Sequence, residues 1–231
     1  MQHVLEQIKA YTKGVEKEDP SCTIEICTRC GKSPGEFKIH DRRKRIFLVI
    51  VGQLVQKIIT ILFRWKCPLC GETFTLYPDF ALPNKRYVRE DIFKRSLCFV
   101  ENENMSYRQV VKDAGKAIFH GNPEKLEETI SKYGLGAIGS REFAHSTVHS
   151  WLTTISGFKE ATNKALHMIR TKSSTSKIFR KIQPVFPRKY RSRKRKEILQ
   201  MAFQFLKTEN EYKAIFKISI FPHFKTACCF F

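Results

Sequence analysis

The spacing of apolar residues in the first third of the chain predicts a short helix followed by a β-hairpin. The helix has its apolar face at Val4, Leu5, Ile8 and Tyr11. Residues 46–63, IFLVIVGQLVQKIITILF, are rich in Ile and Val, which favours two strands that turn near Gly52-Gln53. In the second strand, alternate positions predict an apolar face of Ile59, Ile61, Phe63 and Trp65 opposite a face that includes Gln56, Thr60, Arg64 and Lys66.

Beyond residue 90 the apolar spacing becomes helical. One helix is predicted over Asp91–Val100, and a second begins at a capping box formed by Ser106 and Gln109 and ends at Gly115. A third is predicted over residues 123–133.

A further helix is predicted in AHSTVHSWLTTISGF, residues 144–158, with an apolar stripe at Val148, Trp151, Leu152 and Ile155. The other face is polar and almost uncharged, with His145, Ser146, Thr147, His149, Ser150 and Thr154. Short hydroxyl and imidazole side chains allow a helix to enter the DNA major groove and contact base edges. An ordinary capped surface helix is the alternative.

Two CxxC-Gly motifs, CTRCG and CPLCG, supply four candidate metal ligands: Cys27, Cys30, Cys67 and Cys70. A hairpin between the motifs returns the chain to its starting point, so the two turns can close a four-cysteine zinc ribbon. Such a shell has no open position, and the zinc is therefore predicted to be structural. Two disulfides, buried thiols or a redox pair are the alternatives, and Cys22 is a weaker candidate ligand. Cys98 is expected to be a buried thiol, and no function is assigned to Cys228 and Cys229.

The charge of the chain indicates a polyanionic partner. The net charge is +20 with a pI near 9.8, and residues 172–231 carry about +12 of it. Nucleic acid is the first candidate and an anionic membrane surface the second. The densest basic run is PRKYRSRKRKE, residues 187–197, which can track phosphates or form a solvated face.

Targeting features are not visible in the sequence. The segment 46–63 is a poor membrane span because it carries Lys57 and two Gln near its middle. Residues 1–19 lack the apolar core and cleavage site of a signal peptide. We expect a protein without a membrane partner that is cytoplasmic and associated with the nucleoid.

Four segments in a fixed order link the chain to a known family: CPLCGETFTLYPDFALPNKRY, MSYRQVVKDAGKAIF, REFAHSTVHSWL and FPRKYRSRKRKEIL. With them the chain resembles a zinc-binding, helix-turn-helix domain family of unknown function associated with bacterial transposable elements. The resemblance implies that Cys67 and Cys70 bind zinc and that Ser146–Leu152 belongs to a recognition helix. The stretch 116–140 departs from the short turn of a simple helix-turn-helix.

Together these observations predict an α+β protein. The expected order is an N-terminal helix (1–20), a zinc ribbon with a β-hairpin and a connector (21–88), a helix-turn-helix-like domain (89–160) and a basic helical tail (161–231). Beyond the polar face of residues 145–154, the DNA-binding candidates are Lys85, Arg86, Arg141, Arg188, Lys189, Arg191, Arg193, Lys194 and Arg195.

Catalysis is not expected. The chain has five Asp residues, none after Asp113, and shows no Gly-rich phosphate loop or nucleophile elbow. The predicted function is a non-catalytic, zinc-containing protein that binds double-stranded DNA and serves transposition as an accessory factor or regulator, with a transposase as a further partner. The alternative is an RNA-binding protein or an adaptor that bridges a transposase to nucleic acid.

Overall fold

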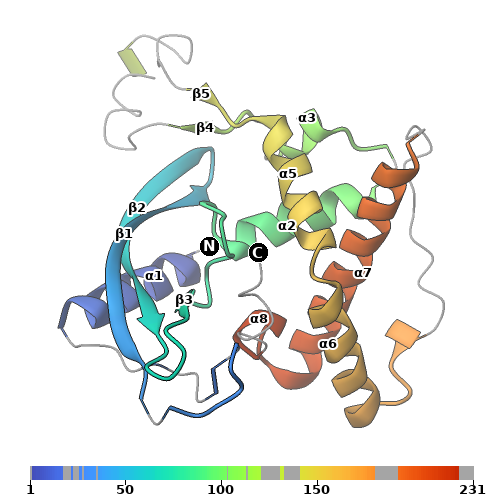
Figure 1. Ribbon diagram of the computed structural model, residues 1–231. Coiled ribbons are helices and arrows are strands. Elements are labelled where there is room, and N and C mark those ends of the chain that lie inside the picture. The colour runs from blue at the N-terminus through green and yellow to red at the C-terminus, as the bar shows by residue number, and fades with distance from the viewer. Residues whose placement is uncertain are drawn as a thin grey trace. The chain divides into compact units, whose positions relative to one another are not determined.

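The computed structural model describes residues 2–17, 22, 26, 27, 29–34, 36–102, 104–112, 114–120, 131, 132, 141–179 and 192–223. These residues form two compact units. Unit 1 draws on Met1–Val49 and Lys57–Arg89, and unit 2 on Ile50–Gln56 and Glu90–His223. The elements of both units are labelled in Figure 1. A single β-hairpin contributes its arms to unit 1 and its tip to unit 2.

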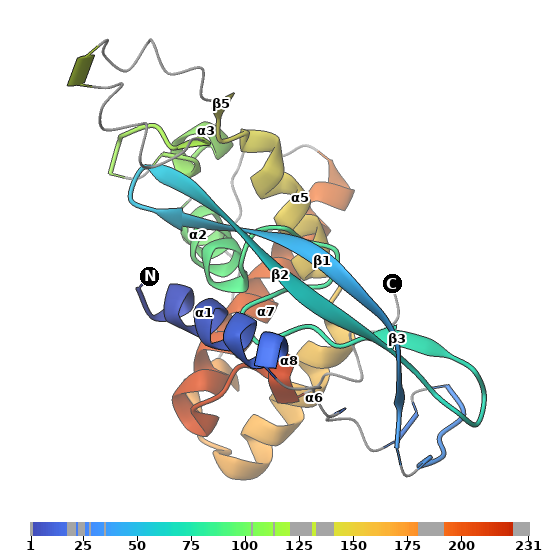
Figure 2. The ribbon, with the colours of Figure 1, turned by 90° about the vertical axis from the view of Figure 1, so that its left-hand side faces the viewer.

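Unit 1 is framed by a helix and a long hairpin. Its elements are α1 (Gln2–Lys17), β1 (Lys38–Val51), β2 (Leu54–Lys66) and β3 (Thr73–Thr75). Gly52 has a φ of 58°, the left-handed conformation that tight hairpin turns use, so the predicted turn is confirmed. β3 pairs antiparallel with the end of β2. The helix α1 lies against the hairpin (Figure 2), where the Tyr11 hydroxyl donates a hydrogen bond to the Ile61 carbonyl at 3.0 Å.

The burial predicted along β2 is only partly correct. Phe63 and Trp65 are buried, but Ile59 is 53% exposed and Thr60 is buried. The reason is the contact with α1, because the Thr12 hydroxyl donates a hydrogen bond to the Thr60 hydroxyl at 3.1 Å. The helix therefore covers a small polar side chain that strand alternation alone would leave in solvent.

The segment PDFALPNKRY, residues 78–87, supplies part of the core of unit 1. Phe80 is buried, and its ring meets the rings of Tyr11 and Phe47 edge-on at centroid distances of 5.6 and 5.2 Å. The Leu48 N–H donates a hydrogen bond to the Arg86 carbonyl at 2.9 Å, and the Val88 N–H donates one to the Leu48 carbonyl at 3.0 Å. These two bonds tie the segment to β1. The predicted connector is thus anchored to the hairpin.

Unit 2 is mainly helical. Its longer helices are α2 (Arg89–Glu101), α5 (His145–Ser156), α6 (Lys159–Lys172) and α7 (Arg193–Phe216). Its shorter elements are α3 (Tyr107–Val110), β4 (Phe119–His120), β5 (Arg141–Glu142), η2 (Lys177–Phe179) and α8 (Ile220–His223). β4 pairs parallel with the hairpin tip at Leu54 and Val55 and antiparallel with β5.

The core of unit 2 forms around α5 and α7, which pack against each other (Figure 1). The predicted stripe on α5 is confirmed, because Val148, Trp151, Leu152 and Ile155 are all buried. An aromatic cluster of Phe158, Phe205 and Phe221, with ring centroids 4.6–5.6 Å apart, extends this core.

The helices before β4 differ from the predictions in two places. The capping box is confirmed, since Ser106 and Gln109 exchange hydrogen bonds, but α3 ends at Val110 instead of Gly115. The helix cannot continue to Gly115, because Ala114 and Gly115 have φ values of 46° and 80°, which are incompatible with an α-helix. Cys98 is exposed on α2, which corrects the expectation of a buried thiol. The helix predicted over residues 123–133 lies outside the described residues except for 131 and 132.

Membrane-spanning helices are not found in the described part of the chain, where each helix is too short or too polar to cross a bilayer.

Asp91 joins the hairpin tip to the first turn of α2 and makes folding sensitive to pH. Its carboxylate accepts a hydrogen bond from the Ile50 N–H at 2.8 Å and is 4% exposed. Burial raises the pKa of Asp91 to about 6, although the Ile50 N–H opposes this shift. The folded state therefore holds the Asp91 proton more tightly than the unfolded state does, and this stabilisation is lost as the pH rises through about 6.

We expect Asp91→Asn to remove this pH dependence, because the amide stays neutral and its oxygen can still accept the Ile50 N–H. Between about pH 4 and pH 7, the free energy of unfolding of the parent should fall by about 2–3 kcal/mol relative to that of the variant. Denaturant titrations across this range measure the difference. Glu90→Gln, an exposed neighbour in the same turn, is the control. Parallel curves for parent and Asp91→Asn would contradict the assignment.

Candidate metal centre

The two CxxC motifs fold into matching turns in unit 1. In the first, the Cys27 N–H donates to the Lys32 carbonyl at 2.9 Å and the Gly31 N–H donates to the Cys27 carbonyl at 2.9 Å. In the second, the Cys67 N–H donates to the Glu72 carbonyl at 2.8 Å and the Gly71 N–H donates to the Cys67 carbonyl at 2.9 Å.

A glycine ends each turn in the left-handed region, with φ of 67° at Gly31 and 74° at Gly71. This conformation costs little only for glycine. The glycine after each CxxC therefore explains why both motifs adopt the same turn.

The turns bring the four cysteine sulfurs together. The Sγ atoms of Cys27, Cys30, Cys67 and Cys70 all lie within 4.8 Å of one another, and those of Cys27 and Cys70 are 3.7 Å apart. These four residues can hold a metal ion, and among the described residues they form the one cluster of three or more candidate ligands. Cys22 packs beside the cluster but is not part of the ligand set.

Two of the clustered thiols, Cys27 and Cys70, differ in acidity. The Cys30 N–H lowers the pKa of Cys27 to about 7 against the opposing effect of burial. The Glu72 N–H lowers the pKa of Cys70, but burial and hydrogen bonds with the other cysteines outweigh it and raise the value to about 12. Without a cation, negative charges on these sulfurs would repel one another. A divalent cation removes the conflict because it holds its thiolate ligands deprotonated.

The cluster is built into an apolar core. Cys27 and Cys67 are 1% and 0% exposed, and they pack with Phe37, Phe63, Trp65 and Phe74. On the surface, Arg29 of the first turn forms an ion pair with Glu72 of the second. Because β2 leads directly into Cys67 and β3 follows Glu72, a bound metal would hold the end of the sheet in place.

The polar residues of α5 predicted to contact DNA are accessible to different degrees. His145, Ser146 and Ser150 are exposed, whereas Thr147, His149 and Thr154 are half-buried. The His149 ring meets the Tyr107 ring of α3 edge-on at 6.0 Å. His145 and His149 lie one turn apart, but the described residues place no third metal ligand with them.

The basic candidates lie in both units. In unit 1, Arg86 is exposed and Lys85 is half-buried, and burial lowers the Lys85 pKa. In unit 2, Arg193, Lys194 and Arg195 are exposed in the first turn of α7, and Arg141 lies in β5. Arg188, Lys189 and Arg191 lie outside the described residues.

Sequence reasoning missed a second set of basic residues, which lines a groove of unit 1. Arg43 and Arg45 lie on β1 and Arg64 lies on β2. The run DRRKR did not suggest a strand, because five charged residues hide the alternation of its two faces. The signal lay in its continuity with the apolar strand that begins at Ile46.

Residues 27–116 match the family model of a domain of unknown function (DUF6431), and that domain is therefore present in the chain. It spans both cysteine turns, the hairpin, the segment 78–87, α2 and α3. Among curated proteins and solved structures, none matches the chain.

Proposed function

We propose that this protein is a non-catalytic, zinc-containing protein that binds double-stranded DNA and serves transposition as an accessory factor or regulator. The observation that carries the proposal is the division of α5 into a buried apolar stripe and a partly exposed polar face without acidic side chains and without Lys or Arg. The net charge of +20 supports the choice of a polyanionic partner.

The exposed part of α5 has suitable chemistry for reading bases. His145 and Ser146 lie in its first turn, where recognition helices make base contacts. Ser hydroxyls can both donate and accept hydrogen bonds, and an imidazole can do the same. The buried stripe packs against α7, so these side chains are presented from a helix held by the core.

The basic residues in the first turn of α7 support phosphate binding rather than a solvated surface as the role of this basic run. Arg193, Lys194, Arg195 and Lys196 lie at the N-terminus of a 24-residue helix that has no acidic residue in its first turn. Cations at this end oppose the helix dipole, and the exposed ion pair of Arg193 with Glu197 at 3.0 Å offsets this only in part. In Figures 1 and 2, α7 begins at the same end of unit 2 as α5, which lets one duplex meet both.

Zinc is the ion that best fits the four cysteines. Tetrahedral Zn–S bonds of about 2.3 Å separate the sulfurs by about 3.8 Å, which is close to the observed 3.7 Å between Cys27 and Cys70. Four thiolates are soft ligands and leave no position for a reactive water. The residues Cys27, Cys30, Cys67 and Cys70 would hold the ion, and its role is to stabilise the fold.

The link to transposition comes from the resemblance seen in the sequence. It predicts that deleting the protein from a host carrying its element changes the frequency of transposition. An unchanged frequency would remove this part of the proposal without affecting DNA binding.

A salt titration tests the phosphate contacts of α7. Replacing Arg193, Lys194 and Arg195 with Ala should weaken binding to every duplex alike and flatten the log–log salt dependence by about 0.9 per lost phosphate contact. The control replaces three exposed lysines of α6, Lys159, Lys164 and Lys172, which removes the same charge elsewhere. Equal effects of the two triple variants would show that only net charge matters.

A further inference from the structure

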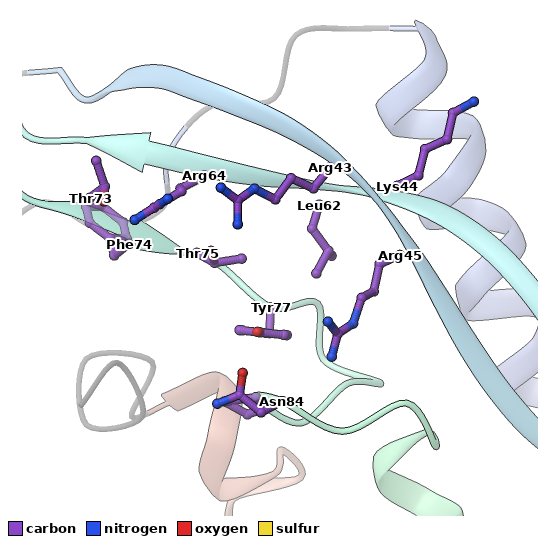
Figure 3. Close-up of a pocket in the computed structure, with 11 residues that line it drawn as sticks. Arg43, Lys44, Arg45, Leu62, Arg64, Thr73, Phe74, Thr75, Tyr77 and Asn84 are labelled. Atoms are coloured by element: carbon purple, nitrogen blue, oxygen red, sulfur yellow. The ribbon is translucent and has the colours of Figure 1, made fainter. Parts of the chain in front are cut away.

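A groove in unit 1 is lined by three arginines from two strands. It has a volume of about 390 Å³ and lies between the β1–β2 hairpin on one side and β3 with the following segment on the other. Figure 3 shows Arg43, Arg45 and Arg64 directed into this space, whereas Lys44, which also borders the groove, extends its side chain away from it. The difference follows from the strand, because neighbouring residues project from opposite faces.

The groove is electropositive, although Arg43 is paired with a carboxylate. Arg43 donates from Nε to Asp41 at 2.6 Å, an exposed ion pair that leaves the other guanidinium donors available. Of the described residues that line the groove itself, none is acidic. The Nε of Arg45 is buried and has no hydrogen-bond partner within the described part of the chain. A buried guanidinium N–H without a partner is costly, whereas the guanidinium end of Arg45 lies at the groove, where a phosphate oxygen can bind it.

The remaining lining residues add hydrogen-bonding groups and an aromatic ring. Thr73 and Thr75 of β3 contribute hydroxyls, and Asn84 contributes an amide. The Tyr77 side chain lies between Thr75 and Asn84 in Figure 3. Arginines beside an accessible aromatic ring are the combination that holds single strands, since the cations track phosphates and the ring stacks on a base.

The size of the groove selects among nucleic acids. A volume of 390 Å³ is that of a pocket for a small molecule. It can admit an unpaired nucleotide, whereas the paired bases of a duplex are not available to stack on a side chain.

We propose that this groove binds a single-stranded segment of nucleic acid, with phosphates on Arg43, Arg45 and Arg64 and a base stacked on Tyr77. This activity is distinct from duplex reading by α5 and lies wholly in unit 1. It also depends on the metal centre, because β3, one wall of the groove, follows the second cysteine turn directly.

The test measures binding of the full-length protein to a fluorescent oligothymidylate of about 12 nucleotides, a length typical of single-strand sites. Arg45→Ala and Arg64→Ala should each lower the affinity about tenfold. Tyr77→Leu should lower it about fivefold or more, and Tyr77→Phe should restore it. Lys44→Ala removes the same charge from the neighbouring position of the same strand and should have little effect.

Two comparisons distinguish binding in the groove from simple charge attraction and from binding at α5. Inorganic polyphosphate carries the charge of the oligonucleotide without bases, so Tyr77→Leu should leave its binding unchanged. Ser146→Ala on α5 should leave oligothymidylate binding unchanged. The groove variants, in turn, should leave the preference of the protein for one duplex over another unchanged. If the protein shows no preference among duplexes, the oligothymidylate measurements therefore still test the groove.

Three results would overturn the proposal. They are an equal loss of affinity in Lys44→Ala and Arg45→Ala, an unaltered affinity in Tyr77→Leu, and the absence of oligothymidylate binding by the metal-loaded parent. Each variant must keep the thermal midpoint and metal content of the parent. For Arg64, which lies near the cysteine turns, Arg64→Lys provides a second variant that keeps the charge but loses the planar fork.

Discussion

Cys67→Ser is expected to remove the bound metal and to destabilise unit 1 by more than about 3 kcal/mol. Structural zinc contributes directly to folding free energy, and the loss of one of four thiolates opens the shell. Cys67 has no exposed surface and packs with Phe63, Trp65 and Phe74, so its loss also disturbs the apolar core. Metal analysis of protein purified in reducing buffer without chelator should give about one zinc per parent chain and none for the variant.

Two cysteine controls make this experiment specific. Cys98→Ser changes an exposed thiol in unit 2 and should affect neither metal content nor stability. Cys22→Ser changes the half-buried thiol beside the cluster and should leave the metal in place. A metal-free parent would contradict the four-cysteine site, and loss of metal in Cys22→Ser would assign the ligands differently.

Trp151→Ala should lower the free energy of unfolding of unit 2 by about 3–5 kcal/mol. The side chain is 2% exposed and its ring lies 5.4 Å from that of Phe143. Removing it leaves a cavity where α5 packs against α7, and these helices cannot close it without moving. Denaturant unfolding followed by circular dichroism measures the loss.

The matched control for Trp151 is Thr153→Ala on the exposed side of α5. The Thr153 hydroxyl only donates a hydrogen bond to the His149 carbonyl of its own helix, at 3.0 Å. We expect a change within about 0.5 kcal/mol. A loss below about 1 kcal/mol for Trp151→Ala would mean that the stripe on α5 does not hold the core together.

Local patterns in the sequence predicted the features that depend on neighbouring residues. The glycine after each CxxC set the geometry of the cysteine turns, Ser106 and Gln109 formed the capping box, and the stripe on α5 was buried as its spacing indicates. Each of these signals lies within a few residues of the structure that it specifies.

The features that the sequence did not predict arise from contacts between distant segments. Phe119 pairs with Leu54 across more than 60 residues, and β4 and β5 have only two residues each, too few for a visible alternation. Thr60 is buried because α1 covers it. The groove of unit 1 combines residues of three strands and a following loop. The sequence alone therefore did not show that its arginines lie close together.

The measurement that tests the proposed function most directly compares the affinity of the protein for a duplex selected from random sequences with its affinity for unselected duplex. Both are measured at one fixed salt concentration, for the parent and for His145→Ala and Ser146→Ala. If α5 reads bases, the parent prefers the selected duplex, and each variant loses about 1–3 kcal/mol on it per lost base contact while binding unselected duplex as before. Equal affinities for the two duplexes in the parent and in both variants would contradict sequence-specific recognition by α5 and favour RNA binding or an adaptor role.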